Sequence, residues 1–344
     1  MNRKTSGSIR SSLFNIMIQR LMERGGYFLV QPNGQNKHMV RKVRNNFLEL
    51  RGRGCWHQID CPCICERTVP FLPPVRLIGE VKYHMSEVKK ESVRNFLGVL
   101  ADIREGSMVM DLYGTGTPGV QRTDMGVIFA ANGFWPEAER LAYSHEIRTI
   151  SYKNNRQMRR LKELIFELES RYLDYDVVMQ QGNFLAQFEQ VIDRELPADQ
   201  FAEMYNLRLE TVGLMEGLVQ ELEKIKTSFF ASTAAGIMIH FLGNEEFPAE
   251  LFASSDTAVC RVGLEASGSE RSYYLQLAED ENKRRFYFSP PEGFQEQALY
   301  GWEKKKGEGG NERVLYASMK INGMERSLRL VMDTDWWSAL SFEL

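Results

Sequence analysis

The sequence has no long hydrophobic run. No stretch approaches the roughly 18 to 20 consecutive apolar residues that a membrane-spanning helix requires, and the N-terminal segment lacks the apolar region and cleavage site of a signal peptide. With 43% hydrophobic residues in 344, the chain can still bury a sizeable core. We therefore expect a globular cytoplasmic protein without a membrane segment, built from two domains and a small third module.

The sequence also lacks an excess of either charge. Lys and Arg total 43 and Asp and Glu total 46, so the formal net charge is only −3. Proteins that coat nucleic acid indiscriminately need a large basic excess, because their affinity comes from releasing phosphate counterions. The composition argues against that class but leaves room for a local basic channel.

Cysteine is scarce, and its distribution is uneven. Four of the five cysteines lie between Cys55 and Cys65, and the fifth is Cys260. An odd, clustered set does not resemble a secreted disulfide framework and favours a reducing compartment. The alternating Cys61, Cys63 and Cys65 are expected to be small apolar side chains on one strand face. A zinc site that adds Cys55 and His57 is the alternative, although C-x-C-x-C is not the usual spacing.

The first 150 residues alternate between strand and helix patterns. Helical periodicity is present between Ile9 and Met22 and between Val88 and Ile103, and Pro136 begins a third helix. The strands are predicted at Tyr27–Gln31, Phe47–Leu50, Trp56–Asp60, Val75–Tyr83, Met108–Tyr113, Met125–Ala131 and Ile147–Tyr152. This alternation predicts an α/β fold with a central sheet flanked by helices.

The pattern changes after residue 152. Long helices are predicted at 154–172, 175–194 and 207–226, and Gly236 ends this region. A β-rich segment follows, in which Asn322-Gly323 is a typical hairpin turn between two strands. We predict three parts: residues 1–152 as the α/β domain, 153–236 as a helical connector or dimerisation region, and 237–344 as a β-rich recognition or regulatory domain.

One group of residues has the composition of a metal-dependent hydrolytic site. Glu80 and Lys82 lie two apart on a predicted strand, so both project from one face, and Asp60 ends the preceding strand. If the two strands are neighbours, Asp60, Glu80 and the Val81 carbonyl can bind a hard cation such as Mg²⁺. Such a cation activates water, and a lysine steadies developing charge. A solvated strand face with an incidental ion pair is the alternative.

Four ordered segments carry a family resemblance. R-G-R-G-C-W-H-Q-I-D (Arg51–Asp60), P-V-R-L-I-G-E-V-K-Y (Pro74–Tyr83), S-V-R-N-F-L-G-V-L-A-D-I (Ser92–Ile103) and M-G-V-I-F-A-A-N-G-F-W-P-E-A-E-R-L-A-Y (Met125–Tyr143), followed by I-R-T-I-S-Y, together resemble the Mrr-like restriction endonuclease family. This family belongs to the PD-(D/E)xK nuclease superfamily. The resemblance covers about the first 150 residues.

The resemblance implies both a fold and an activity. It implies a restriction-endonuclease-like core and a Mg²⁺-dependent DNA endonuclease, with Mn²⁺ as a substitute, in which Asp60, Glu80 and Lys82 are catalytic. It further suggests restriction or anti-phage defence, under the control of a regulatory partner protein. Many relatives carry another acid on the first helix, where this chain has Asn15. Three alternatives remain for that acid: Glu49, Glu23, or a site that works with only two acids.

Several neighbours of these residues are weaker candidates. His57 and Gln58 precede Asp60 and have the chemistry to position water or phosphate, although a structural hydrogen-bonding role is the simpler interpretation. Arg51 and Arg53 are flanked by glycines, which permit close approach to a phosphate backbone.

Cutting both strands of a duplex usually needs two active sites, so we expect a homodimer or higher oligomer. The rival hypotheses are a nucleic-acid-binding or regulatory protein whose nuclease fold no longer cleaves, and an RNA-cleaving effector on the same fold.

Overall fold

The computed structural model describes most of the chain. It covers residues 6–34, 36–43, 45, 47–65, 74–112, 122–173, 178, 183–233, 236–267, 270–291, 314–321 and 324–333. Within these ranges the protein is a mixed α/β structure with three sheets, one of which closes into a barrel.

A five-stranded sheet forms the centre of the N-terminal half. Its strands, in spatial order, are β1 (Phe28–Leu29), β5 (Cys61–Cys65), β6 (Val75–Lys82), β7 (Thr123–Ala130) and β8 (Arg148–Ser151). The β5–β6 pair is antiparallel, whereas β6–β7 and β7–β8 are parallel. Strand β6 therefore lies in the middle of a mixed sheet, where both of its faces are covered.

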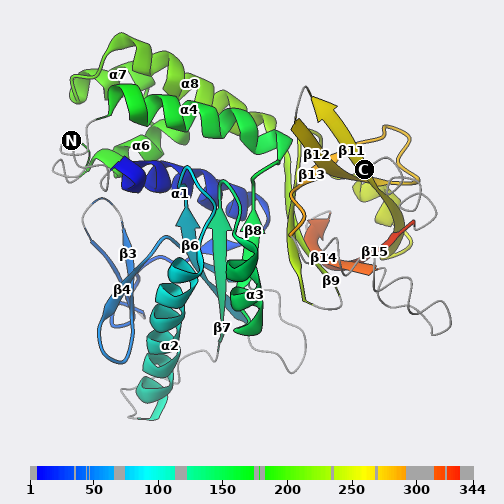
Figure 1. The fold of residues 1–344 in the computed structure, drawn as a ribbon, viewed down its shortest axis with the longest axis horizontal. Coiled ribbons are helices and arrows are strands. Elements are labelled where there is room, and N and C mark those ends of the chain that lie inside the picture. Colours follow the sequence, from blue (N-terminus) through cyan, green and yellow to red (C-terminus); the bar gives the residue numbers. More distant parts are fainter. Residues whose placement is uncertain are drawn as a thin grey trace.

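Helices cover the two faces of this sheet (Figure 1). Helix α1 (Ser6–Arg24) packs its apolar side chains against Leu77 and Val81 of β6. Helices α2 (Lys90–Leu112) and α3 (Pro136–Ser144) pack against the opposite face, which includes Ile78. The two-residue period of β6 thus places alternate side chains in two separate cores, as its sequence predicts.

A small antiparallel sheet lies beside the central one. It consists of β2 (Val40–Lys42), β3 (Leu48–Arg51) and β4 (Trp56–Ile59). Its inner face contributes Val40, Leu48, Leu50 and Ile59 to the core beneath α2. Asp60 is the single residue between β4 and β5, so it stands where the chain passes from one sheet to the other.

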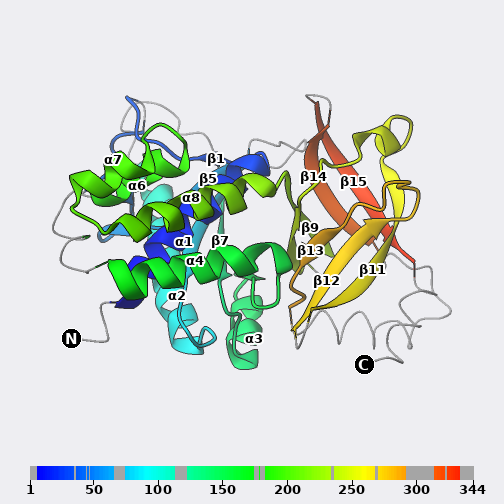
Figure 2. The same cartoon turned by 90° about the horizontal axis from the view of Figure 1, so that it is seen from above.

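Four helices form a layer above α1 (Figures 1 and 2). They are α4 (Arg156–Tyr172), α6 (Phe184–Ile192), α7 (Ala198–Met204) and α8 (Leu209–Lys224). Their buried faces join the same core as α1, so α1 is enclosed between the sheet and this layer. Helix α7 is absent from the sequence-based prediction.

The C-terminal part is a closed seven-stranded barrel. Its members are β9 (Thr227–Thr233), β10 (Met238–Gly243), β11 (Thr257–Ser267), β12 (Glu270–Leu277), β13 (Phe286–Phe288), β14 (Val314–Ile321) and β15 (Met324–Met332). A short 3-10 helix, η2 (Ala249–Phe252), contributes Phe252 to the barrel's own core. Strands β14 and β15 pair as the predicted hairpin.

A buried hydrogen-bonded chain joins the barrel to the central sheet. His240 of β10 contacts the Tyr152 hydroxyl through Nδ1 (2.7 Å) and the Ser228 hydroxyl through Nε2 (2.8 Å). Ser228 donates its single hydroxyl proton to the Leu21 carbonyl, so it accepts from His240 Nε2–H. Nδ1 then accepts from Tyr152. Burial lowers the pKa of His240 to about 3, which keeps this ring neutral.

Two predictions of secondary structure are wrong. Residues 108–112 of the predicted strand Met108–Tyr113 continue α2, and Tyr113 lies outside the described residues. A short apolar run fits either a strand or a buried helix, and here the preceding helix simply extends. The helical region was expected to reach Gly236, but Thr227–Thr233 is a barrel strand paired with β10 and β14. The barrel therefore begins before the predicted boundary at 237.

Across the described part of the chain, no helix has the length and apolarity that crossing a membrane requires.

Candidate functional site

Strand β6 positions two of the candidate residues. Glu80 and Lys82 project from the face that carries Ile78, and they form an ion pair with each other. Each side chain is 24% exposed. The neighbouring Val81 is buried on the other face beneath α1. The predicted sharing of one strand face by Glu80 and Lys82 is therefore confirmed.

Asp60 reaches the same place from the position just before the adjoining strand β5. Cys61 is paired with Gly79 in the antiparallel β5–β6 ladder, so the next position outward sets Asp60 against Glu80. The Val81 amide donates a hydrogen bond of 2.9 Å to Asp60 Oδ2. The amide and the carbonyl of a strand residue point to the same side, so the Val81 carbonyl is directed to the side of β6 on which Asp60 lies.

Asp60 lies in a place that disfavours its charged form. Burial, and then the negative charge of Glu80, raise the pKa of Asp60 to about 7. The Val81 amide and the charge of Lys82 oppose this shift without cancelling it. Two carboxylates with one lysine beside them form a site in which an added cation relieves repulsion.

Helix α1 holds the backbone of Asp60 from the other side. Asn15 Nδ2 and Gln19 Nε2 donate hydrogen bonds of 2.8 and 2.7 Å to the Asp60 carbonyl oxygen. Asn15 is buried, and its Oδ1 has no hydrogen-bond partner among the described residues. Asn15 and Gln19 are four apart, one helical turn, in an otherwise apolar stretch. That spacing is the sequence signal from which this pair of hydrogen-bond donors could have been predicted.

A cavity of about 390 Å³ opens beside Asp60. Asn15, Gln19 and Glu23 of α1 line it, together with Lys42 of β2 and residues of α6. Glu80 and Lys82 are not among its lining residues, so the cavity meets the candidate site at Asp60. Its wall mixes acids and bases: Glu23 pairs with Arg20, which also pairs with Asp193 of the wall.

The accessory candidates on β3 and β4 face elsewhere. Glu49 forms an ion pair with Arg41 across β2 and β3 and lies opposite Gln58 on β4. The guanidinium carbon of Arg41 lies 4.3 Å from the centre of the Trp56 ring, and that of Arg51 lies 5.5 Å from the same point. A basic and aromatic surface, formed by Arg41, Arg51 and Trp56, thus occupies the outer face of the small sheet.

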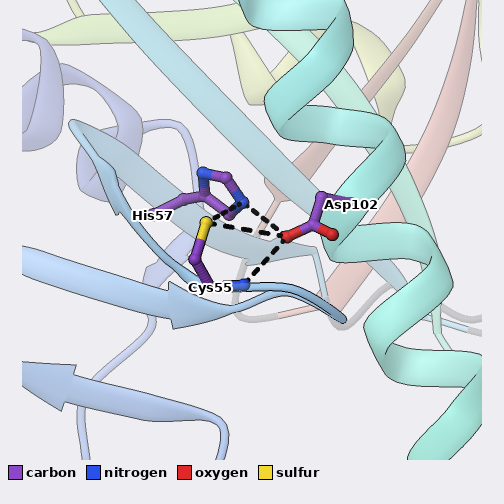
Figure 3. Close-up of side chains that lie close together, drawn as sticks. All are labelled: Cys55, His57 and Asp102. Atoms are coloured by element: carbon purple, nitrogen blue, oxygen red, sulfur yellow. Dashed lines mark hydrogen bonds and ion pairs between the residues drawn. The ribbon is translucent and has the colours of Figure 1, made fainter.

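His57 and Arg53 belong to the region that contacts α2. His57 Nε2 donates a 2.7 Å hydrogen bond to Asp102 Oδ2 and so is directed to α2 (Figure 3). This bond, and then the Gly54 amide, lower the pKa of Asp102. Arg53 pairs with the exposed Glu105. Sequence reasoning did not connect His57 with Asp102, because 45 residues separate them.

The alternating cysteines behave as apolar side chains. Cys61 and Cys63 are buried beneath α1 with their sulfur atoms 3.4 Å apart. The hydrogen bond between the two thiols, and then burial, raise the pKa of Cys61 well above its ordinary value. A protonated thiol is a poor zinc ligand, so this pair favours the apolar interpretation.

Comparisons with known proteins identify no family. No family model matches the chain, and no curated protein matches it. Among solved structures, the crystal structure of a protein of unknown function, AF1548, aligns over 61% of this chain and 95% of that chain, with 13% identity and a TM-score of 0.34. A likeness at that level carries no argument about fold or activity.

Proposed function

We propose that this protein is a Mg²⁺-dependent endonuclease with a restriction-endonuclease-like core, in which Asp60, Glu80 and Lys82 are the catalytic residues. The observation that carries this proposal is the meeting of Asp60 with Glu80 and Val81 across the β5–β6 ladder. A residue from a separate segment thereby completes a site of two acids and one lysine. A central mixed sheet with helices on both faces is the architecture that the resemblance implies.

The donor set fits a hard divalent cation. Two carboxylates and a backbone carbonyl are oxygen ligands, which Mg²⁺ prefers, and Mn²⁺ shares this preference. Burial, and then the charge of Glu80, raise the pKa of Asp60, and a bound cation would favour the ionised carboxylate. Bound Mg²⁺ would lower the pKa of the water that it coordinates and place positive charge beside the phosphate.

Each residue has a definite task in this proposal. Asp60 and Glu80 hold the ion, and the Val81 amide fixes one carboxylate oxygen of Asp60. Lys82 lies against Glu80 and neutralises it before the substrate arrives. In the reaction its ammonium group holds the attacking water or a phosphate oxygen and steadies the charge that develops there.

The site works with two acids in this proposal. Asn15 replaces the helix acid of many Mrr-like relatives, and its amide holds the Asp60 backbone instead. The other candidates are engaged elsewhere, because Glu49 pairs with Arg41 and Glu23 pairs with Arg20. Asn15 and Gln19 thus position Asp60 without adding charge.

The outer face of the small sheet supports a nucleic-acid substrate. Arginines stacked on a tryptophan offer phosphate contacts and a platform for bases. We propose DNA as the substrate, with RNA as the alternative, and we propose that the enzyme cuts a duplex as a homodimer or larger oligomer. A role in restriction or anti-phage defence, together with control by a partner protein, rests on the family resemblance alone.

Incubation with plasmid DNA and Mg²⁺ tests the activity. Glu80→Gln and Lys82→Met keep the size of each side chain, and both should lower cleavage by at least about 100-fold. Glu137→Gln, which changes an exposed acid on α3, is the matched control and should cut normally. A panel of double-stranded DNA, single-stranded DNA and RNA identifies the substrate.

The loss of the helix acid at Asn15 favours one rival, a protein that binds nucleic acid without cleaving it. Tight binding with no cleavage of any substrate, with Mg²⁺ or Mn²⁺, would establish that rival. Cleavage that survives in Glu80→Gln would remove these residues from the active site.

A further inference from the structure

The turn between β3 and β4 is pressed against α2. A Cβ added to Gly52 would lie 2.0 Å from Asp102 Oδ2, and one added to Gly106 would lie 2.5 Å from the Gly52 carbonyl carbon. The Arg53 amide donates to the Asp102 backbone carbonyl at 3.0 Å. The glycines therefore permit a close approach that brings the side chains of this turn to Asp102.

Three side chains with different ligand atoms meet at this contact (Figure 3). His57 Nε2 lies 3.4 Å from Cys55 Sγ and 2.7 Å from Asp102 Oδ2. The Cys55 sulfur lies 4.0 Å from the same carboxylate oxygen. Within the part of the chain that the structure describes, these are the residues in which three potential metal ligands converge in this way.

The arrangement does not suit a cysteine nucleophile. In a nucleophilic triad, the acid orients one ring nitrogen of the histidine while the other nitrogen takes the proton of the nucleophile. Here Cys55 and Asp102 both face Nε2. A single nitrogen cannot bond the acid and accept the thiol proton at the same time. The three side chains therefore point to one place and do not form the Cys–His–Asp series that a nucleophile needs.

A convergent set of sulfur, nitrogen and oxygen suits a borderline-soft cation. Tetrahedral zinc, with bonds of about 2.0 to 2.3 Å, separates its ligand atoms by roughly 3.3 to 3.6 Å. The Cys55–His57 separation of 3.4 Å lies within that range, the His57–Asp102 separation of 2.7 Å is shorter, and the Cys55–Asp102 separation of 4.0 Å is longer. Rotation of exposed side chains adjusts them, and Cys55 is exposed. Three protein ligands would leave a fourth coordination position for water.

The surrounding backbone already orients the carboxylate. The Gly54 amide donates a 2.9 Å hydrogen bond to Asp102 Oδ1, the oxygen that does not face His57. Such outer contacts hold a ligand in place and are common around metal sites. The second oxygen therefore stays directed to Cys55 and His57.

We propose that Cys55, His57 and Asp102 form a Zn²⁺ site, separate from the Asp60 and Glu80 pair. On binding, the Cys55 thiol releases one proton to solvent and its thiolate bonds the ion. The ring proton of His57 moves to Nδ1, so that Nε2 bonds the ion through its lone pair. The ion links β4 to α2. Its ligand His57 lies three residues before Asp60, so the ion would stabilise the strand that leads to the candidate active site.

Cobalt spectroscopy of the metal-free full-length protein tests the site. Co²⁺ reports tetrahedral coordination through its visible absorption and a thiolate ligand through a near-ultraviolet charge-transfer band. One Co²⁺ per chain should bind with both signatures, and Zn²⁺ should displace it while Mg²⁺ should not. Cys55→Ser should abolish the thiolate band, and Asp102→Asn should weaken Zn²⁺ binding by at least about 10-fold.

Matched controls separate this site from the others. Cys65→Ser removes a thiol outside the cluster, and Asp60→Asn removes the acid of the candidate nuclease site, so both should keep the thiolate band. Circular dichroism checks that each variant is folded. A band that survives in Cys55→Ser, a band that disappears in Cys65→Ser, or the absence of any band from the native protein would overturn the proposal, whatever the nuclease assay shows.

Discussion

The backbone amide of Val81 donates a 2.9 Å hydrogen bond to Oδ2 of Asp60, which joins strand β6 to the residue between β4 and β5. This single contact brings the carboxylate of Asp60 beside Glu80. It explains how three residues that span 23 positions of sequence can act at one place. It also leaves Asp60 in a position where ionisation is costly.

That cost predicts an unusual dependence of stability on pH. The folded pKa of Asp60 is about 7, above its ordinary value of 3.8. Below 3.8 the residue is neutral in both states, and as pH rises towards 7 the unfolded chain loses its proton first, so stability falls. The loss in the metal-free protein is on the order of 4 kcal/mol at most.

Asp60→Asn should remove this loss. The variant should be more stable than the native protein at pH 8 and similar to it at pH 4, as measured by urea unfolding in a chelator. Mg²⁺ at pH 8 should stabilise the native protein and leave Asp60→Asn unchanged. Parallel pH profiles for the two proteins would show that Asp60 is not the group responsible.

The β5–β6 register depends on the absence of a side chain at Gly79. A Cβ there would lie 2.6 Å from the Cys61 carbonyl oxygen, next to Asp60. Gly79→Ala should therefore cost about 1 to 3 kcal/mol and impair cleavage by moving Asp60. Gly98 on α2 has open space around its Cα, so Gly98→Ala is the control and should stabilise the helix by up to about 1 kcal/mol. Equal effects of the two changes would contradict this account.

The junction between the barrel and the sheet should be sensitive to acid. The folded pKa of His240 is about 3, below its ordinary 6.5. The stability that the neutral ring contributes is present above pH 6.5 and is lost as pH falls towards 3, by about 5 kcal/mol. Unfolding curves between pH 4 and 8 measure it. Asp60 contributes the opposite slope over much of this range, so the comparison is made in the Asp60→Asn background. There His240→Gln should flatten the profile, whereas the exposed His145→Gln should keep its slope.

The outer face of the small sheet should contribute to nucleic-acid affinity. Arg41→Ala and Arg51→Ala should each weaken binding to DNA of any sequence. Each should also lower the slope of log affinity against log salt concentration by the amount that corresponds to about one phosphate contact. Trp56→Ala should weaken single-strand binding by about 1 to 3 kcal/mol, because it removes a stacking platform. Fluorescence anisotropy at several salt concentrations measures both effects. Arg171→Ala on α4 is the control, and an equal loss in that variant would remove the special role of this face.

Much of the local structure could be predicted from sequence because it depends on near neighbours. The two-residue period of β6 places Glu80 and Lys82 on one face, and the spacing of apolar residues predicts α1 and α2. The strand predicted at Met108–Tyr113 failed because a short apolar run looks the same in a helix and a strand. Strand β9 directly follows helix α8 and is apolar like it, so the predicted helical region extends across it to Gly236, although β9 pairs with its sequence neighbour β10.

By itself, the sequence determined which residues have the right chemistry: two acids and a lysine in one region, and a cysteine and a histidine two positions apart in another. Only the tertiary structure decided which of them meet. The β5–β6 register sets Asp60 beside Glu80 and Val81, and the close approach of Gly52 to α2 sets His57 beside Asp102. The reason is physical, because contacts across sheets and between helix and turn depend on the folding of distant segments, which no local period encodes.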